Sequence, residues 1–176
     1  NHFSFFLDAS RCELGVLVGH VARANPIWRQ SPSGIPTLVT FQGPQAYISP
    51  SWYPSKHEHG KVVLTWNYAV VHAHGRPTFI QDREWLHNHV SSLTREHEAR
   101  RPQPWAVSDA PTDYVDKMLT AVVGVEIPIS RLEGKWKMSQ NRVESDRAGV
   151  VSGLQQERDQ QAAAVALSVN ATLGSK

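Results

Sequence analysis

Residues 122–138 read VVGVEIPISRLEGKWKM and form one extended run whose first part, VVGVEIPI (122–129), is rich in Val and Ile. Such a density of β-branched residues favours a strand over a helix. Pro128 and Gly134 fall within the run and are typical of a bulge or of a sheet edge. We therefore expect a long strand here, and we expect it to be the last strand of the sheet.

The chain before this run predicts several strands separated by turn residues. They are FSFFL (3–7), GVLVGHVA (15–22), PTLVTF (36–41), AYIS (46–49) and KVVLTWNYAVVHAHGRPTFIQD (61–82). Residues 15–22 are apolar at both odd and even positions apart from His20, so this strand should be buried on both sides. Gly75 and Pro77 suit a tight reversal, which predicts a hairpin centred on residues 73–77.

Helices are expected between and after these strands. Asp82 is a suitable N-cap for a helix that buries Leu86, Val90 and Leu93. A shorter helix should begin near residues 108–111. Its apolar face is expected to hold Val115, Met118, Leu119 and Val122.

The pattern as a whole predicts an α+β fold built on an antiparallel barrel. A docked helix should close the domain near Leu154. We expect one domain over residues 1–154, followed by a helical or disordered tail over residues 155–176. The end of this tail has little to bury, so we expect it to fray.

Composition and charge exclude several classes of protein. The net charge is +2 and the sequence pI is about 8.8, which is too mild for a dedicated nucleic-acid binder. The single Cys12 allows neither an internal disulfide nor a cysteine metal cluster, and this favours the cytoplasm. No apolar run approaches the ~20 residues that span a bilayer, so no membrane contact is expected.

Metal and catalytic motifs are absent from the sequence. His72 and His74 are the best-spaced pair for a metal, but no third ligand lies nearby and structural zinc almost always needs four. Cys12 lies beside two charged residues in a turn and reads as an incidental thiol. The sequence therefore predicts no metal site and no catalytic residue.

Three segments concentrate aromatic rings and hydrogen-bonding side chains: AYISPSWYPSK (46–56), LTWNY (64–68) and GKWKMSQNR (134–142). A planar heteroaromatic ligand with a charged tail would use such residues, because rings give flat walls and polar groups hold phosphate. The alternative is that the Trp rings are core residues and the polar residues cap strand ends. The residues alone leave both interpretations open.

Longer segments that contain these residues resemble the signature segments of the PaiB family, whose members are FMN-binding negative transcriptional regulators. The resemblance runs in order from residue 1 to residue 154. It rests on GHVARANPIW (19–28), FQGPQAYISPSWYPSK (41–56), TWNY (65–68), PWAVSDAP (104–111) and RLEGKWKMSQNR (131–142).

The resemblance implies a split β-barrel of the flavin-reductase and pyridoxamine-phosphate-oxidase type, forming a homodimer with FMN at the subunit interface. The family usually begins further upstream, so this chain is expected to lack the first barrel strands. The primary candidates for holding FMN are Lys137, Ser139, Gln140, Asn141, Arg142, Trp66, Asn67 and Tyr68. The secondary candidates are Arg23, Asn25, Ser51 and Lys56.

Three functions follow as hypotheses. The first is negative regulation of transcription, with FMN as a sensor ligand or a structural cofactor. The second is an enzyme, a flavin-dependent reductase or oxidase of a small molecule, since flavin itself supplies the hydride chemistry. The third is a haem-binding barrel with His20 or His72 as the axial ligand. The sequence shows neither a helix-turn-helix nor a basic recognition helix, so DNA contact is open.

Strand alternation within residues 134–142 separates the expected roles. Trp136 and Met138 should pack inward, while Lys137 shares the opposite face with Ser139 and Asn141. The basic group of Lys137 is therefore expected to matter more for FMN than that of the neighbouring lysine in the run.

Overall fold

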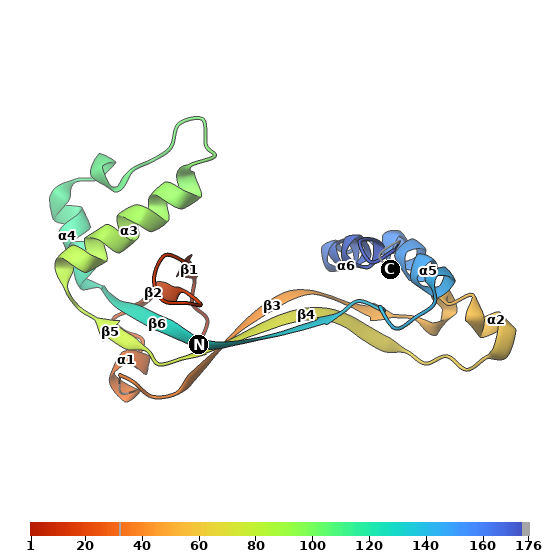
Figure 1. The fold of residues 1–176 in the computed structure, drawn as a ribbon. Coiled ribbons are helices and arrows are strands. Elements are labelled where there is room, and N and C mark those ends of the chain that lie inside the picture. Colours follow the sequence, from red (N-terminus) through yellow and green to blue (C-terminus); the bar gives the residue numbers. More distant parts are fainter. Residues whose placement is uncertain (32, 174–176) are drawn as a thin grey trace. The chain divides into compact units, whose positions relative to one another are not determined.

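The computed structural model describes residues 1–31 and 33–173, and in these residues six strands form one antiparallel sheet to which helices are attached (Figure 1). The strand order is β1-β2-β6-β4-β3, and β5 pairs with β6. This order has two ends, so the sheet is open and not a closed ring. The predicted α+β class and antiparallel split-barrel type are confirmed.

The strands are β1 (Phe5–Asp8), β2 (Val16–Ala22), β3 (Thr37–Ile48), β4 (Thr65–Gly75), β5 (Thr78–Ile80) and β6 (Val122–Lys137). The helices are α1 (Ile27–Gln30), α2 (Ser55–His59), α3 (Arg83–Glu98), α4 (Thr112–Thr120), α5 (Glu144–Gln156) and α6 (Gln160–Asn170), with 3₁₀ turns η1 (Pro50–Trp52) and η2 (Val107–Asp109).

The chain divides into two compact units. The first unit consists of Asn1–Val39 and Ala73–Leu132, and the second consists of Thr40–His72 and Glu133–Lys176. Strands β3, β4 and β6 contribute residues to both units.

The first unit has β2 at its centre, paired antiparallel with β1 and with β6. Val16, Leu17, Val18 and Val21 are all buried, which confirms the expected two-sided burial of this strand. Leu17 lies opposite Ile127 in the register and packs in one core cluster with it. Because β5 pairs with the other edge of the same stretch, the amino-terminal half of β6 is also an inner strand of the unit.

Helix α3 begins where the sequence predicts. The Asp82 side chain accepts a hydrogen bond from the backbone N–H of Trp85 at 2.7 Å, so it caps the helix. Leu86 is fully buried on the inner face. Trp85 lies against Gly124 of β6, where a Cβ atom would come within 2.2 Å of the indole ring. The glycine thus allows α3 to approach the sheet closely.

Three expectations about local structure are wrong. The single strand β3 (Thr37–Ile48) takes the place of the two strands expected within residues 36–49. The chain does not reverse at residues 73–77, because β5 pairs with β6, with Phe79 opposite Val125. Pro77 lacks an N–H and interrupts the strand without turning it back. In helix α4, Met118 is 41% exposed, and Val122 already belongs to β6.

Helices α5 and α6 pack against each other and against β3 and β4 of the second unit (Figure 1). Their core holds Ile48, Val150 and Leu154. Helix α6 buries a stripe of small residues, namely Ala162, Val165, Ala166 and Val169. The expected fraying is therefore wrong for residues 160–170, and residues 174–176 lie outside the described part of the chain.

Candidate functional site

Lys137 is the last residue of β6 and lies half-buried in the second unit. Its Nζ donates a hydrogen bond to the hydroxyl of Thr65 at 2.5 Å. An ammonium group carries three N–H donors, so this contact orients the side chain and leaves donors for an anion. Sequence patterns do not identify Thr65 as a site residue, although it directly precedes the candidates Trp66, Asn67 and Tyr68.

Ser139 and Asn67 are both buried and bond to each other. The Asn67 amide donates to the Ser139 hydroxyl at 3.0 Å, and the hydroxyl oxygen lies 3.2 Å from the Asn67 carbonyl oxygen. Ser139 has a φ of 61°, in the left-handed region that is costly for a residue with a side chain. The two hydrogen bonds hold this conformation and so fix the direction of the turn after β6.

The side chain of Gln140 closes the same turn from the other side. Its Oε1 accepts from the backbone N–H of Met138 at 2.7 Å, and its Nε2 donates to the carbonyl of Trp136 at 2.8 Å. The backbone N–H of Arg142 donates to the Ser139 carbonyl at 2.9 Å. Both polar ends of Gln140 thus serve the backbone, and Asn141 is left exposed at the tip of the turn.

Arg142 lies with its guanidinium carbon 4.7 Å from the ring centroid of Tyr53. Tyr53 is fully buried, and burial raises the pKa of its phenol while the Arg142 cation partly offsets the rise. A guanidinium stacked on a ring keeps N–H donors at its edge. Arg142 is therefore a second cation held in place at the end of the turn.

Trp66 and Trp136 do not belong to this polar group. Strand alternation predicts the orientation of Trp66 correctly and the burial of Trp136 wrongly. Trp66 is 51% exposed and lies edge-to-face with Tyr47, with the ring centroids 6.1 Å apart. Successive side chains of a strand point to opposite faces, so Trp66 faces away from the side of β4 that contacts Lys137. Met138 is fully buried as expected, but inward packing of Trp136 is wrong, since it is 56% exposed and outside the core cluster. Tyr68 is half-buried.

Arg23 and Asn25 belong to the first unit, where their polar groups serve the fold. The Arg23 guanidinium donates to the carbonyls of Thr120 at 2.7 Å and Val122 at 3.1 Å, and to the Gln81 side chain at 2.7 Å. The Asn25 side chain accepts from the backbone N–H of Ile27 and donates to Asn1, both at 3.0 Å. These bonds fix the loop after β2.

Ser51 and Lys56 lie in the second unit, on the segment that links β3 to β4. Both are exposed, and the Lys56 Nζ lies 3.5 Å from the Ser51 hydroxyl. This long contact leaves the Lys56 ammonium available to solvent or to a ligand.

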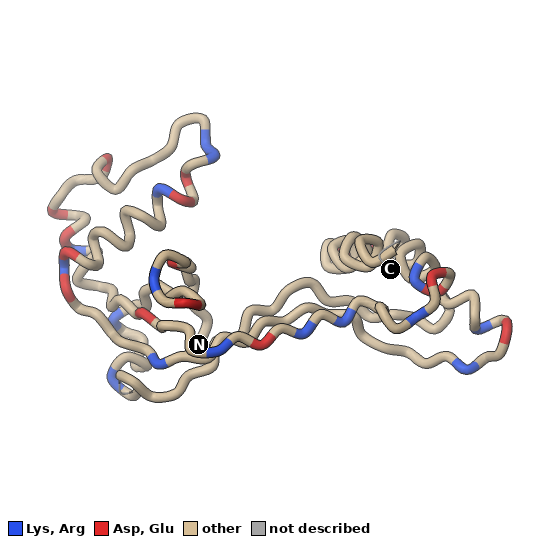
Figure 2. The backbone as a smooth tube through the Cα atoms, viewed as in Figure 1, with Lys and Arg blue, Asp and Glu red and all other residues tan. Residues whose placement is uncertain are grey.

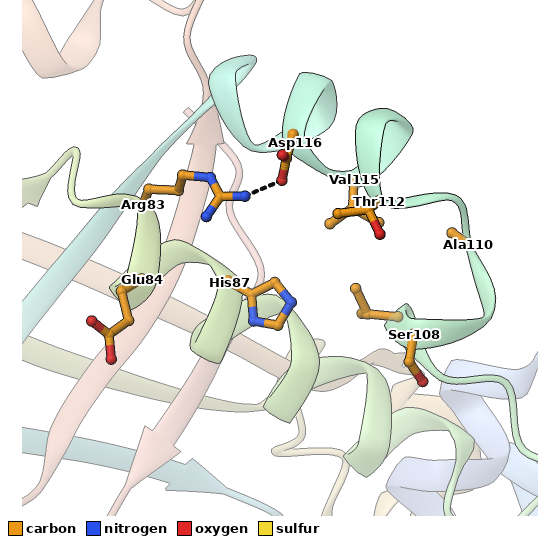
Figure 3. Close-up of a pocket in the computed structure, with 9 residues that line it drawn as sticks. Arg83, Glu84, His87, Ser108, Ala110, Thr112, Val115 and Asp116 are labelled. Carbon is orange, nitrogen blue, oxygen red and sulfur yellow. Dashed lines mark hydrogen bonds and ion pairs between the residues drawn. The ribbon is translucent and has the colours of Figure 1, made fainter.

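A cavity of about 590 Å³ in the first unit lies between α3 and α4 (Figure 3). His87 projects toward it, and Ser108 and Thr112 also line it. Arg83 and Asp116 form an ion pair at one end. None of the residues chosen from the sequence lines this cavity, so it carries no flavin assignment.

The first unit also contains a histidine pair that sequence reasoning did not connect. The Nδ1 of His20 lies 3.0 Å from the Nε2 of His89, and the Trp85 ring stacks on His89. The Trp85 indole N–H donates to Glu126 at 3.2 Å, and Glu126 is held by both terminal nitrogens of Arg11. His89 follows Leu86 by three residues, so the helical period of the buried face was a signal that could have found it.

Burial keeps both histidines neutral near neutral pH. Burial, together with the adjacent His20, lowers the pKa of His89 to about 4, and burial also lowers the pKa of His20. The bidentate contact with Arg11 lowers the pKa of Glu126, so the nearest carboxylate stays charged. One neutral imidazole can then donate to the other.

We expect acid to destabilise the first unit through this pair. A folded-state pKa below the ordinary 6.5 means that the unfolded chain binds the proton more tightly, so stability is complete above pH 6.5 and falls as pH drops toward about 4. The loss should be about 1 to 2 kcal/mol, less than the full shift implies because water can relax around the ring. Urea unfolding across this range measures it. In the variant His89→Gln, the free energy of unfolding should fall less steeply between pH 6.5 and about 4. The exposed His97→Gln should show the same pH dependence as the wild type.

The features described so far define a class of protein: an open antiparallel split-barrel sheet with flanking helices and a donor-rich turn after its longest strand. Comparison with known proteins narrows the class. A family model described as "Putative FMN-binding domain" matches residues 1–131. The chain therefore belongs to this FMN-binding family, which is the PaiB family that its motifs resemble, and FMN is the cofactor of the family.

Similar sequences agree with this assignment. A protein of Emericella nidulans, named "Uncharacterized protein AN0679", is 36% identical over 186 residues, covering 88% of this chain and 74% of that protein. "Protease synthase and sporulation protein PAI 2" of Bacillus subtilis is 34% identical over 143 residues, covering 81% of this chain and 66% of that protein. The chain thus spans two thirds to three quarters of the length of these relatives.

A solved structure shows the same fold. The FAD and haem binding protein of Mycobacterium smegmatis aligns with a TM-score of 0.54 at 18% identity, covering 83% of this chain and 63% of that chain. At this identity the likeness concerns the fold alone. Within residues 1–31 and 33–173, no helix is both long enough and apolar enough to cross a membrane.

The residues of the second unit fit FMN chemically. Lys137 and Arg142 are positioned cations suited to a phosphate, and Asn141 offers an amide at the exposed tip of the turn. The family match ends at residue 131, before this turn. Binding of FMN by this turn is therefore proposed from the turn's own side chains and not from the family match.

Proposed function

We propose that this chain binds FMN through the turn at residues 137–142 and acts as a negative regulator of transcription. The observation that carries the binding proposal is the position of Lys137. The residue is half-buried, its ammonium group is oriented by the Thr65 hydroxyl, and further N–H donors remain for a phosphate. Lys137 and Arg142 would hold the phosphate and Asn141 an edge of the ring system. FMN, when bound, supplies redox chemistry that the protein side chains lack.

A titration of the purified chain with FMN tests the binding proposal. Binding should perturb the flavin absorbance and quench its fluorescence. At a hundred times the dissociation constant it should add about 2.7 kcal/mol of stability, which a thermal melt reveals. An unchanged flavin spectrum together with an unchanged melting temperature would contradict it.

We include a homodimer and a cytoplasmic location in this proposal. Support for the homodimer comes from apolar side chains that the strands of the second unit expose, among them Phe41, Val71 and Trp136. Sedimentation analysis should give twice the mass of the chain, and a monomer at all concentrations would count against the dimer.

The regulatory part of the proposal is supported by membership of the PaiB family and leaves the mode of action open. Lys and Arg are interspersed with Asp and Glu along the described helices, and they do not gather on one recognition element (Figure 2). Direct DNA binding should appear as a gel shift that weakens steeply with salt, since phosphate contacts release counterions. If no shift occurs and nicotinamide cofactor bleaches the bound flavin faster than free FMN, the chain is a reductase instead.

A further inference from the structure

A second cavity in the second unit combines aromatic rings with carboxylates. It has a volume of about 280 Å³, and its lining includes Tyr47, Trp52, Trp66, Glu157 and Asp159. Among the described residues, no Lys or Arg lines it; Arg158, which separates the two acids in the chain, is not a lining residue. The lining is therefore aromatic and acidic at once.

The structure fixes the aromatic wall. Trp52 lies against α5 at Gly153, where a Cβ atom would come within 2.2 Å of the indole ring. Tyr47 and Trp66 contact each other edge-to-face on neighbouring strands, and both remain partly exposed. Rings held in this way present their electron-rich faces without needing to rearrange on binding.

The two carboxylates lie where the chain passes from α5 to α6. Asp159 caps α6, and its Oδ2 accepts from the backbone N–H of Ala162 at 3.1 Å. A carboxylate has about four lone-pair sites, so this cap leaves capacity for a ligand. Glu157 is exposed at the end of α5. Both groups repel a phosphate and attract a cation.

We propose that this cavity binds a small organic cation with an alkylammonium or quaternary ammonium group. Aromatic rings attract such cations through their quadrupoles, and nearby carboxylates add Coulomb attraction. The volume restricts the ligand to a small head group. The site is distinct from the proposed flavin turn, because none of residues 137–142 lines this cavity.

Calorimetric titration of the full chain with tetramethylammonium and with choline tests this proposal. Both cations should bind and raise the melting temperature. The neutral isostere 3,3-dimethylbutanol should bind at least tenfold more weakly, because it has the shape of choline without the charge. Equal binding of the isostere, or no binding of either cation, would overturn the proposal.

Variants locate the site. Trp66→Leu and Glu157→Gln should each weaken choline binding by roughly tenfold. Asp159→Asn should do the same while keeping the helix cap, since Asn is as good an N-cap as Asp. The exposed Trp136→Leu and Glu58→Gln serve as matched controls and should bind choline like the wild type. Wild-type binding by Trp66→Leu, or equal losses in the controls, would overturn the assignment.

Discussion

Lys137→Ala should weaken FMN binding by roughly ten- to a hundredfold. A charge-assisted hydrogen bond from an ammonium to phosphate contributes about 1.5 to 3 kcal/mol, which corresponds to that range in affinity. The Lys137 ammonium is already oriented by Thr65, so little side-chain entropy is lost when phosphate binds. Fluorescence titration of the purified variant with FMN measures the change.

Lys135 provides the matched control, because it lies two residues earlier on the same strand and is exposed. Lys135→Ala removes the same charge from the chain, so any general electrostatic effect appears in both variants. Its FMN affinity should stay within about threefold of the wild type at physiological salt. If both variants lose affinity equally, the phosphate is not held by Lys137 and the turn has been assigned wrongly.

The elements that the sequence predicts correctly are those whose pattern is local. Helix α3 carries its own N-cap at Asp82 and a regular apolar period, and β6 is a long β-branched run. These signals depend on neighbouring residues and not on distant partners. Alternation is a weaker guide at the end of β6, because it places Trp136 and Met138 on one face and only Met138 is buried.

The errors arise where a distant partner decides the outcome. Residues 73–77 have the composition of a turn, but β6 offers a pairing partner on both sides of Pro77, so the chain continues along it. The stripe of α6 is made of Ala and Val, which looks weakly apolar in sequence and yet packs closely against α5. Local sequence patterns and propensities do not identify such distant partners.

The same distinction between local pattern and distant partner applies to the candidate site. Sequence motifs selected the turn after β6, but they could not distinguish residues that build the turn from residues that its geometry leaves available. The polar groups of Asn67, Ser139 and Gln140 form hydrogen bonds that hold the turn itself. Arg23 is similarly used by the fold of the first unit. That distinction depends on hydrogen-bond partners, which the sequence does not contain.

Gly149→Ala should destabilise the second unit by about 3 kcal/mol, against the usual trend for a helix. Alanine in a helix interior is normally favoured over glycine by about 1 kcal/mol. At Gly149 of α5, however, an added Cβ would lie 2.0 Å from the backbone carbonyl oxygen of Trp52 and 3.1 Å from Pro54. Backbone atoms cannot rotate away as a side chain can, so α5 and η1 must separate.

Urea unfolding of Gly149→Ala and of a matched control measures this effect. Ser152→Ala lies on an exposed position of the same helix and should change stability by no more than about 0.5 kcal/mol. Trp52 lies on η1 and Leu154 on α5, and both line the aromatic and acidic cavity. A separation of the two elements should therefore weaken choline binding as well. If Gly149→Ala instead stabilises the chain, helix propensity exceeds the clash and the close packing of α5 on η1 is not rigid.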